Sequence, residues 1–295
     1  MIGYDWDRGE VFWALARERE RMKACGVCYH GGALLVASDD TVRRFTPERV
    51  DSVELPGTQN SLSHSIHPIG QGEFGVIDTG HSCLRVFRDD LSPSRVLEPL
   101  AAWGDLPPDA IHLNDFAVTP RGIVASCFDY RPWRKVQAEL SWECWCRGGY
   151  GLALNLTGDR GAGAGRVVGC GWNHPHSLVY RDGHLHLCSA AAGVFHACAF
   201  TDDGTLVERR RVPVTQTHFL RGAWHSGDGW FLGGSTSRHG EVMARDMAVY
   251  FLDDASGRCT SKAVPGAGEI YDVLPWRDDL LGLILRRHFH EPLPK

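Results

Sequence analysis

Four histidines, His64, His112, His174 and His176, stand close to the starts of predicted β-strands. Imidazoles bind divalent transition metals and exchange protons near neutral pH. Arg221, at the start of another predicted strand, carries a guanidinium that can hold a carboxylate or a phosphate. Side chains this far apart in the sequence act together only if the fold brings them to one place, which depends on the strands that carry them.

Most of these residues belong to a triplet that recurs six times: a first residue that is mostly large and polar, a small or acidic residue, then an apolar one. The clearest copy is His176-Ser177-Leu178; the others are His64-Ser65-Ile66, Asn114-Asp115-Phe116, Arg221-Gly222-Ala223, Tyr271-Asp272-Val273 and, more weakly, Cys25-Gly26-Val27. The first members are 39, 50, 62, 45 and 50 residues apart, and turn signals such as Asp182-Gly183 punctuate the apolar runs between them. Repeats of this length made of short strands are typical of a β-propeller. The sequence therefore predicts an all-β fold, a single six-bladed β-propeller domain over residues 1–295.

The predicted ring carries three additions. Glu10–Met22 has apolar residues at helical spacing and predicts a short helix, so residues 1–24 are expected to form an N-terminal helical extension. Two insertions, Asp129–Gly149 and Ser235–Asp246, fall between the second and third strands of blades three and five. Because blade strands alternate in direction, both are expected to overhang the face where the triplets begin, with the tryptophan-rich 129–149 segment as a lid-like cover.

The sixth blade is expected to be incomplete in sequence order. Only Ile270–Leu274 and Leu280–Leu285 remain for it, so we expect it to borrow outer strands from the N-terminal segment and thereby close the ring without an unpaired edge.

The first strand of each blade lies nearest the channel of a propeller, so matching residues are expected to share a layer. Two residues before the triplets, toward the channel mouth, the side chains are Lys23, Leu62, His112, His174, Phe219 and Glu269. Two residues after the first members, every side chain is apolar: Val27, Ile66, Phe116, Leu178, Ala223 and Val273. This gradient predicts a polar pocket above an apolar floor.

Imidazoles and carboxylates that converge from several blades suit a divalent transition metal such as iron, zinc or copper, or general acid–base chemistry. The residues expected to bind the metal are His64, His174, His176 and Glu269. The residues expected to act on the substrate are His112, Asn114, Asp115, Arg221 and Tyr271, with Arg221 as its anchor. Asp115 and Asp272 have a second interpretation, which we favour: they point into the blades and cap backbone N–H groups. The histidines also have a simpler interpretation, in which they only satisfy backbone groups and channel water.

Composition narrows the class of protein. The net charge is −5 and no sustained basic run is present, which argues against nucleic acid as a partner. No signal-peptide pattern and no apolar run long enough to cross a bilayer is found, and the ten cysteines are scattered, so we expect a cytoplasmic protein with free thiols. Cys144-Trp-Cys146 lies in the lid-like insertion and offers two neighbouring thiols for a soft metal or for oxidation, although an ordinary cover is the simpler interpretation.

Four motifs occur in a characteristic order: His-Leu-Asn-Asp-Phe-Ala (112–117), His-Pro-His-Ser-Leu (174–178), Phe-Leu-Arg-Gly (219–222) and Ile-Tyr-Asp-Val (270–273). In this the chain resembles a bacterial family of uncharacterised β-propeller proteins. More distantly it is similar to the six-bladed group of gluconolactonases and strictosidine synthases. That resemblance implies an active site at the channel mouth and, for the lactonases, a divalent metal held by carboxylates and amides, where this chain has histidines and Arg221 instead.

Two functions follow from the sequence. The first is an enzyme that hydrolyses, opens, isomerises, eliminates or oxidises a small polar or carboxylated metabolite at a histidine-rich channel mouth. The second is a non-catalytic propeller that binds a peptide or protein on the same face. A broad exposed apolar patch around Trp133, Trp142 and Trp145 would favour the second. No feature of the sequence indicates an oligomeric state.

Overall fold

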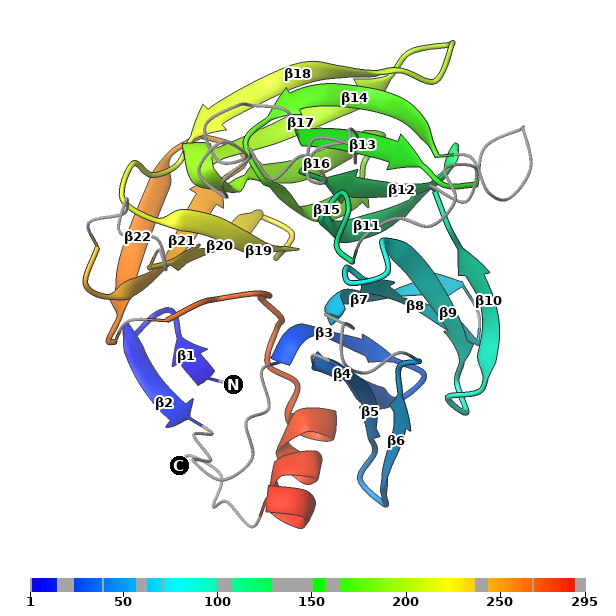
Figure 1. Cartoon of the computed structure of the whole chain (residues 1–295). Coiled ribbons are helices and arrows are strands. Elements are labelled where there is room, and N and C mark those ends of the chain that lie inside the picture. The colour runs from blue at the N-terminus through cyan, green and yellow to red at the C-terminus, as the bar shows by residue number, and fades with distance from the viewer. Residues whose placement is uncertain are drawn as a thin grey trace.

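The structure, a computed structural model, describes residues 2–14, 24–38, 40–56, 63–70, 72–99, 108–128, 151–157, 165–236, 244–266 and 268–289. These residues form five four-stranded antiparallel sheets arranged as blades around one channel (Figure 1). A two-stranded sheet, β1 (Ile2–Asp5) and β2 (Glu10–Ala14), lies between the last blade and the first. The predicted all-β propeller is confirmed.

Within each blade the strands follow the chain from the channel outward. Blade 1 contains β3 (Ala24–His30), β4 (Ala33–Ser38), β5 (Thr41–Phe45) and β6 (Val50–Glu54). Blade 2 contains β7 (Ser63–Gly70), β8 (Glu73–Asp78), β9 (Cys83–Arg88) and β10 (Pro93–Leu97). Blade 3 contains β11 (Leu113–Thr119), β12 (Gly122–Cys127), β13 (Gly151–Asn155) and β14 (Arg166–Trp172). Blade 4 contains β15 (Pro175–Arg181), β16 (His184–Ser189), β17 (Val194–Phe200) and β18 (Leu206–Pro213), and blade 5 contains β19 (Phe219–His225), β20 (Gly229–Ser235), β21 (Met247–Asp253) and β22 (Cys259–Val264).

The core lies between neighbouring blades, because each sheet is apolar on both faces near the channel. Phe74, Phe116 and Ile66 are fully buried, and they belong to the apolar clusters that join blades 1 to 2 and 2 to 3. Ile66 and Phe116 are third members of the triplets, as is the buried Leu178 between blades 3 and 4. The apolar floor predicted from the triplets is therefore part of the packing between blades.

The prediction of six blades is wrong for the described residues. Where a sixth sheet would stand, residues 268–277 run beside blade 5 as an extended chain without a ladder partner. One backbone hydrogen bond, from the Thr236 N–H to the Gly268 carbonyl oxygen at 3.0 Å, and two side chains hold it. The Ser235 hydroxyl accepts a hydrogen bond from the Ile270 N–H (2.9 Å) and donates one to the Ile270 carbonyl oxygen (3.2 Å). The Thr236 hydroxyl accepts a hydrogen bond from the Gly268 N–H at 2.8 Å.

Two secondary-structure predictions next to this gap are also wrong. Glu10–Ala14 forms strand β2 rather than the start of a helix, because the consecutive β-branched and aromatic residues of Val11–Trp13 favour an extended chain. Leu280–Leu285 belongs to a short helical segment, η3 (Asp278–Gly282) and η4 (Leu285–Phe289), rather than to a strand. A short apolar run without alternation does not distinguish the two states. Residues 15–23 lie outside the described residues.

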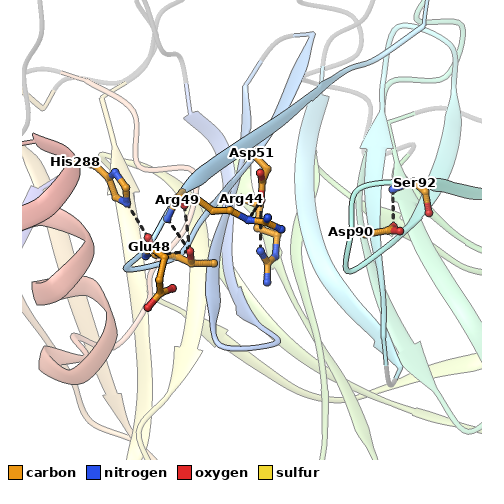
Figure 2. A network of polar contacts seen from close by, with 8 residues as sticks. Arg44, Glu48, Arg49, Asp51, Asp90, Ser92 and His288 are labelled. Atoms are coloured by element: carbon orange, nitrogen blue, oxygen red, sulfur yellow. Dashed lines mark hydrogen bonds and ion pairs between the residues drawn. The ribbon is translucent and has the colours of Figure 1, made fainter.

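The helical segment covers blade 1. Leu280 and Ile284 are buried in a cluster with residues of β4 and β5. At the far end of the segment, His288 bonds through Nε2 to the carbonyl oxygen of Thr46 at 2.7 Å (Figure 2). Close by, Arg44 and Arg49 of blade 1 both pair with Asp51.

The two insertions fall where the sequence places them. β12 ends at Cys127 and β13 begins at Gly151, while β20 ends at Ser235 and β21 begins at Met247, so both connect second to third strands. The lid-like segment with its tryptophans, Cys144 and Cys146, lies outside the described residues. Within the described ranges no disulfide involves Cys28, Cys83, Cys170, Cys188, Cys198 or Cys259. No helix there is long and apolar enough to cross a membrane.

Candidate functional site at the channel mouth

Each triplet on a blade coincides with a β-bulge of the innermost strand. The antiparallel register shifts between Ser63 and Ile66 in β7 and between Leu113 and Asp115 in β11. It shifts likewise in the other three inner strands: between Ala24 and Gly26, between His176 and Val179, and between Arg221 and Ala223. Bulges turn a side chain away from the regular alternation of a strand and are common beside active sites. The repeated triplets are therefore the sequence signature of five equivalent bulges.

Second members of the triplets tie one blade to the next. The Asp115 carboxylate accepts hydrogen bonds from the Leu178 N–H of blade 4 and from the Phe116 N–H, both at 2.8 Å. The Ser177 hydroxyl accepts one from the Gly222 N–H of blade 5 at 2.7 Å. Asp272 accepts a longer one from the N–H of Val27 at 3.4 Å and another from Val273 at 3.0 Å. The capping role predicted for Asp115 and Asp272 is confirmed; a catalytic role for Asp115 stays a prediction.

Below the mouth, His67 bonds through Nε2 to the Asp115 carboxylate at 2.8 Å. Burial lowers the pKa of His67, but the charge and hydrogen bond of Asp115, with the charge of Asp272, outweigh it and leave that pKa raised. Burial raises the pKa of Asp272 to about 6, against the lowering effect of His67. Sequence reasoning missed His67; the only signal was a polar residue directly after the apolar third member Ile66.

The first members His64, His176 and Tyr271 of three triplets meet the mouth residue His112 in the channel, as the sequence predicts. The His64 ring centroid lies 5.2 Å from that of His176, 5.7 Å from that of His112 and 5.7 Å from that of Tyr271. These four residues come from four separate segments: β7, β15, the residue before β11, and the extended chain 268–277. The ring symmetry thus assembles the imidazole cluster.

Two phenylalanines that the sequence did not single out for chemistry complete the wall. Phe128 stacks on His174 with centroids 4.0 Å apart and an interplanar angle of 9°, and its centroid lies 4.3 Å from that of His112. Phe219 lies 5.4 Å from His174 and 6.1 Å from His176. Phe219 occupies a predicted mouth position, whereas Phe128 follows β12, and only its place beside the long insertion could have pointed to it.

Arg221 lies across the channel between two aromatic rings. Its guanidinium carbon is 4.8 Å from the Phe219 centroid and 5.0 Å from the Tyr271 centroid, and Nη1 is 3.9 Å from the Glu269 carboxylate. Burial raises the pKa of Tyr271 to about 12, against the lowering effect of Arg221, and its side chain hydrogen-bonds Glu269. The phenol is therefore protonated at neutral pH and able to donate.

Several buried polar atoms here have no hydrogen-bond partner among the described residues. Besides the Ser65 hydroxyl they include three from the residues singled out for chemistry: Nε2 of His176, Nε of Arg221 and Oδ1 of Asn114. The three side chains are 3%, 7% and 0% exposed. The Asn114 amide nitrogen, by contrast, donates to the Pro175 carbonyl oxygen at 3.3 Å. Buried polar atoms are normally paired, and exceptions occur where a ligand or an ordered water supplies the partner. The set offers a ligand one cationic donor, one amide acceptor and one imidazole nitrogen.

Backbone strain is concentrated in the same place. His112, His174 and Ser177 have φ angles of 50°, 51° and 58°, in the left-handed region that costs energy for residues with a Cβ. Such strain persists only where the surrounding fold imposes it, and here it aims two of the four histidines. The channel between the triplets has a volume of only about 30 Å³, room for about one water, so a larger ligand must sit at the mouth.

His176 is a neutral imidazole. Burial, reinforced by the positive charge of Arg221 and the neighbouring histidines, holds its pKa well below the usual value. We expect the ¹⁵N NMR signals of His176 to report a neutral ring from pH 8 down to about 5, where exposed histidines have already titrated. Arg221→Gln removes one of these causes and should raise the pKa of His176, and an unchanged titration in that variant would contradict the assigned cause.

The geometry gives limited support to the predicted metal site. Within the described residues, no group of three or more histidine, cysteine or acidic side chains is placed to hold a metal ion. Phe128 contacts both His112 and His174, and the Glu269 carboxylate faces Arg221 and Tyr271. The assignment of His64, His174, His176 and Glu269 to a transition metal therefore stays a prediction.

Comparison with known proteins identifies the fold alone. No protein-family model and no curated protein matches the sequence, so the resemblance to an uncharacterised bacterial family stays a prediction. Among solved structures, a luciferin-regenerating enzyme is similar with a TM-score of 0.56 and 9% identity, over 84% of this chain and 78% of that one. Virginiamycin B lyase from Staphylococcus aureus is similar with a TM-score of 0.53 and 12% identity, over 84% of this chain and 72% of that one. Regucalcin from Agrobacterium tumefaciens, a calcium-binding protein, is similar with a TM-score of 0.55 and 10% identity, over 82% of this chain and 75% of that one. This chain is thus similar in fold to β-propeller proteins that include enzymes.

Proposed function

We propose that this protein is a small-molecule enzyme that performs acid–base chemistry on a carboxylated metabolite at the channel mouth. One observation carries the proposal: the unpartnered polar atoms of His176, Arg221 and Asn114 are buried in one cluster. Their types are complementary to an organic acid that carries a hydroxyl group or an acidic C–H.

Each side chain has a distinct role in this proposal. Arg221 pairs with the substrate carboxylate, since a guanidinium is always charged and its Nε has no hydrogen-bond partner within the part of the chain that the structure describes. The neutral His176 accepts a proton through Nε2, and His64, whose ring lies 5.2 Å away, is the neighbouring group that can pass it on. Asn114 accepts a hydrogen bond from the substrate, and so can the Tyr271 hydroxyl oxygen, because its one O–H donates to Glu269. Proton removal beside a carboxylate is the first step of isomerisations and eliminations.

The similar structures bear on the choice of chemistry. A histidine-to-alanine variant of the Staphylococcus aureus virginiamycin B lyase is catalytically inactive, so a related fold carries an essential histidine. Calcium, which regucalcin binds, fits poorly here. Ca²⁺ takes about six to eight oxygen ligands, whereas the Glu269 carboxylate and the Asn114 amide oxygen stand here beside imidazoles and a guanidinium. A transition metal would bind through the imidazoles, and the experiment below separates that version from the metal-free one.

The experiment incubates purified protein with a library of hydroxy acids, unsaturated acids and lactones and follows turnover by NMR. We expect His176→Gln to lower kcat/KM for the substrate found by at least about 100-fold, and Arg221→Gln to act mainly through KM by a similar factor. His184→Gln, at the start of the second strand of blade 4 next to the β15–β16 turn, is the matched control and should leave kcat/KM unchanged. Full activity after chelation supports the acid–base proposal, and loss of activity restored by one metal contradicts it in favour of a metal enzyme. Binding without turnover would favour the non-catalytic propeller.

A further inference from the structure

Between blades 5 and 1, where the described residues form only the two-stranded β1–β2 sheet, lies a cavity of about 660 Å³. Blade 5 supplies one wall through Trp224 and Phe231, whose rings stack with centroids 5.6 Å apart. The extended chain from Gly268 to Trp276 supplies the opposite wall, with the inner strand β3 behind it. Figure 1 shows the elements that carry these lining residues: the gold and orange strands of blade 5, the blue β1–β2 sheet and the orange-red chain that leads to the helix.

The connection between β1 and β2 is fixed against blade 5. Trp6 packs edge-on against Phe231 with centroids 5.3 Å apart, and the Lys262 ammonium group lies 5.0 Å from a Trp6 ring while it donates to the Trp6 carbonyl oxygen. Tyr4 donates through its hydroxyl to the Ala263 carbonyl oxygen at 3.3 Å. These contacts keep Trp6 as an aromatic wall of the cavity.

Size and lining point to a small molecule. Protein interiors contain few voids larger than a water, whereas small-molecule pockets span about 300–1,000 Å³ and are mostly apolar with a few polar groups. Here the apolar lining includes three tryptophans (Trp6, Trp224 and Trp276), and tryptophan faces bind flat rings by stacking and by burial of apolar area.

The polar part of the lining belongs to the channel mouth. Glu269 and Tyr271 line the cavity, and Tyr271 also borders the channel, where its ring lies 5.0 Å from the Arg221 guanidinium carbon and 5.7 Å from the His64 ring. A ligand in the cavity and a carboxylate on Arg221 would thus both contact the Tyr271 side chain.

We propose that this cavity binds the apolar body of the substrate, so that the substrate class is an organic acid with a flat apolar body of two or more rings. The inference rests on the proposed function for the position of the carboxylate, which Arg221 holds. The evidence for a binding site in the cavity is independent of that function and comes from the volume and the lining residues. Tyr271 would then contact both halves of the molecule.

The test uses two probes that share a body and differ in the head group: 2-naphthoate and the neutral 2-naphthylmethanol. Isothermal titration calorimetry should show binding of both, with 2-naphthoate the tighter. Val249→Phe fills the cavity from β21 and should weaken both probes by at least about tenfold, which corresponds to about 1.4 kcal/mol. Val167→Phe makes the same exchange on an exposed strand face of blade 3 and should change neither affinity. Trp276→Ala removes one aromatic wall and provides a second reading if Val249→Phe does not fold.

The outcomes separate the two proposals. If neither probe binds, or if both bind equally well to the wild type, Val249→Phe and Trp276→Ala, the cavity inference is overturned while Arg221 is left as proposed. If both probes bind with equal affinity, depend on Val249 and ignore Arg221→Gln, the cavity is supported and the carboxylate anchor of the proposed function is overturned. Weakening of 2-naphthoate alone by Arg221→Gln, with weakening of both probes by Val249→Phe, supports the full substrate class.

Discussion

Replacing Asp115 with alanine is expected to lower the free energy of unfolding by about 4 kcal/mol. The Asp115 side chain is 8% exposed and holds three groups together: the N–H of Phe116, the N–H of Leu178 in the next blade and the His67 imidazole. Alanine leaves the two buried N–H groups without an acceptor, and it removes the carboxylate partner of His67, whose side chain is 27% exposed. Urea unfolding followed by far-UV circular dichroism would measure the loss as a lower midpoint.

Two other variants separate the effect of losing the hydrogen bonds between blades 3 and 4 from the effect of losing any carboxylate that caps a backbone N–H group. Asp115→Asn keeps one acceptor oxygen but turns an amide NH₂ toward a backbone donor, so it should fall between the wild type and Asp115→Ala. Asp90 also caps a backbone N–H, that of Ser92 at 2.9 Å, but in an exposed turn of blade 2 (Figure 2). Asp90→Ala should therefore shift the midpoint far less, and equal effects at Asp115 and Asp90 would refute the idea that Asp115 ties two blades together.

Gly222→Ala is expected to cost about 3 kcal/mol of stability. The φ angle of Gly222 is +68°, which strains any residue with a Cβ, and a Cβ there would lie 2.9 Å from the carbonyl carbon of Asp272. The added methyl group thus pushes against the backbone that carries Tyr271, with no flexible side chain to yield. The same urea titration measures the loss, and the calorimetric affinity for 2-naphthoate reports any displacement of Tyr271.

Gly183→Ala provides the matched control. Gly183 has a φ angle of +78° in the turn before β16, but no atom lies within 4 Å of a Cβ built on it. Its substitution therefore measures the backbone strain alone, about 1 kcal/mol. If Gly222→Ala costs no more than Gly183→Ala, the contact between blade 5 and the extended chain is looser than the structure describes.

The five complete blades could be predicted because local signals and global fold agree in them. Asp182-Gly183, for example, closes the hairpin between β15 and β16 at the place where the sequence puts a turn. The sixth sector could not be predicted for the opposite reason. Leu280–Leu285 is apolar at nearly every position, and its state is decided by contacts with blade 1, where Leu280 and Ile284 fill a cluster. No periodicity in the run itself encodes that contact.

The sequence predicted which residues converge at the channel of the propeller, but not how their side chains pack there. Equivalent positions on the inner strands had to converge, so His64, His112 and His176 meet as expected. The side-chain surroundings follow from packing, which symmetry does not specify. Phe128 reaches between the histidines from the end of β12, and the left-handed backbone at His174 aims a ring that a regular strand would direct elsewhere.

Four joints of the propeller lie between complete sheets, and the sixth sector is a seam fastened by the hydroxyl groups of Ser235 and Thr236 and by the backbone N–H of Thr236. Because this seam has fewer contacts than the joints between complete sheets, thermal fluctuations of the backbone should be largest along residues 268–277. Tyr271 and Glu269 lie on that seam. A ligand that contacts both sides of this seam would therefore also stabilise the closed propeller, and part of its binding free energy would appear as a higher free energy of unfolding.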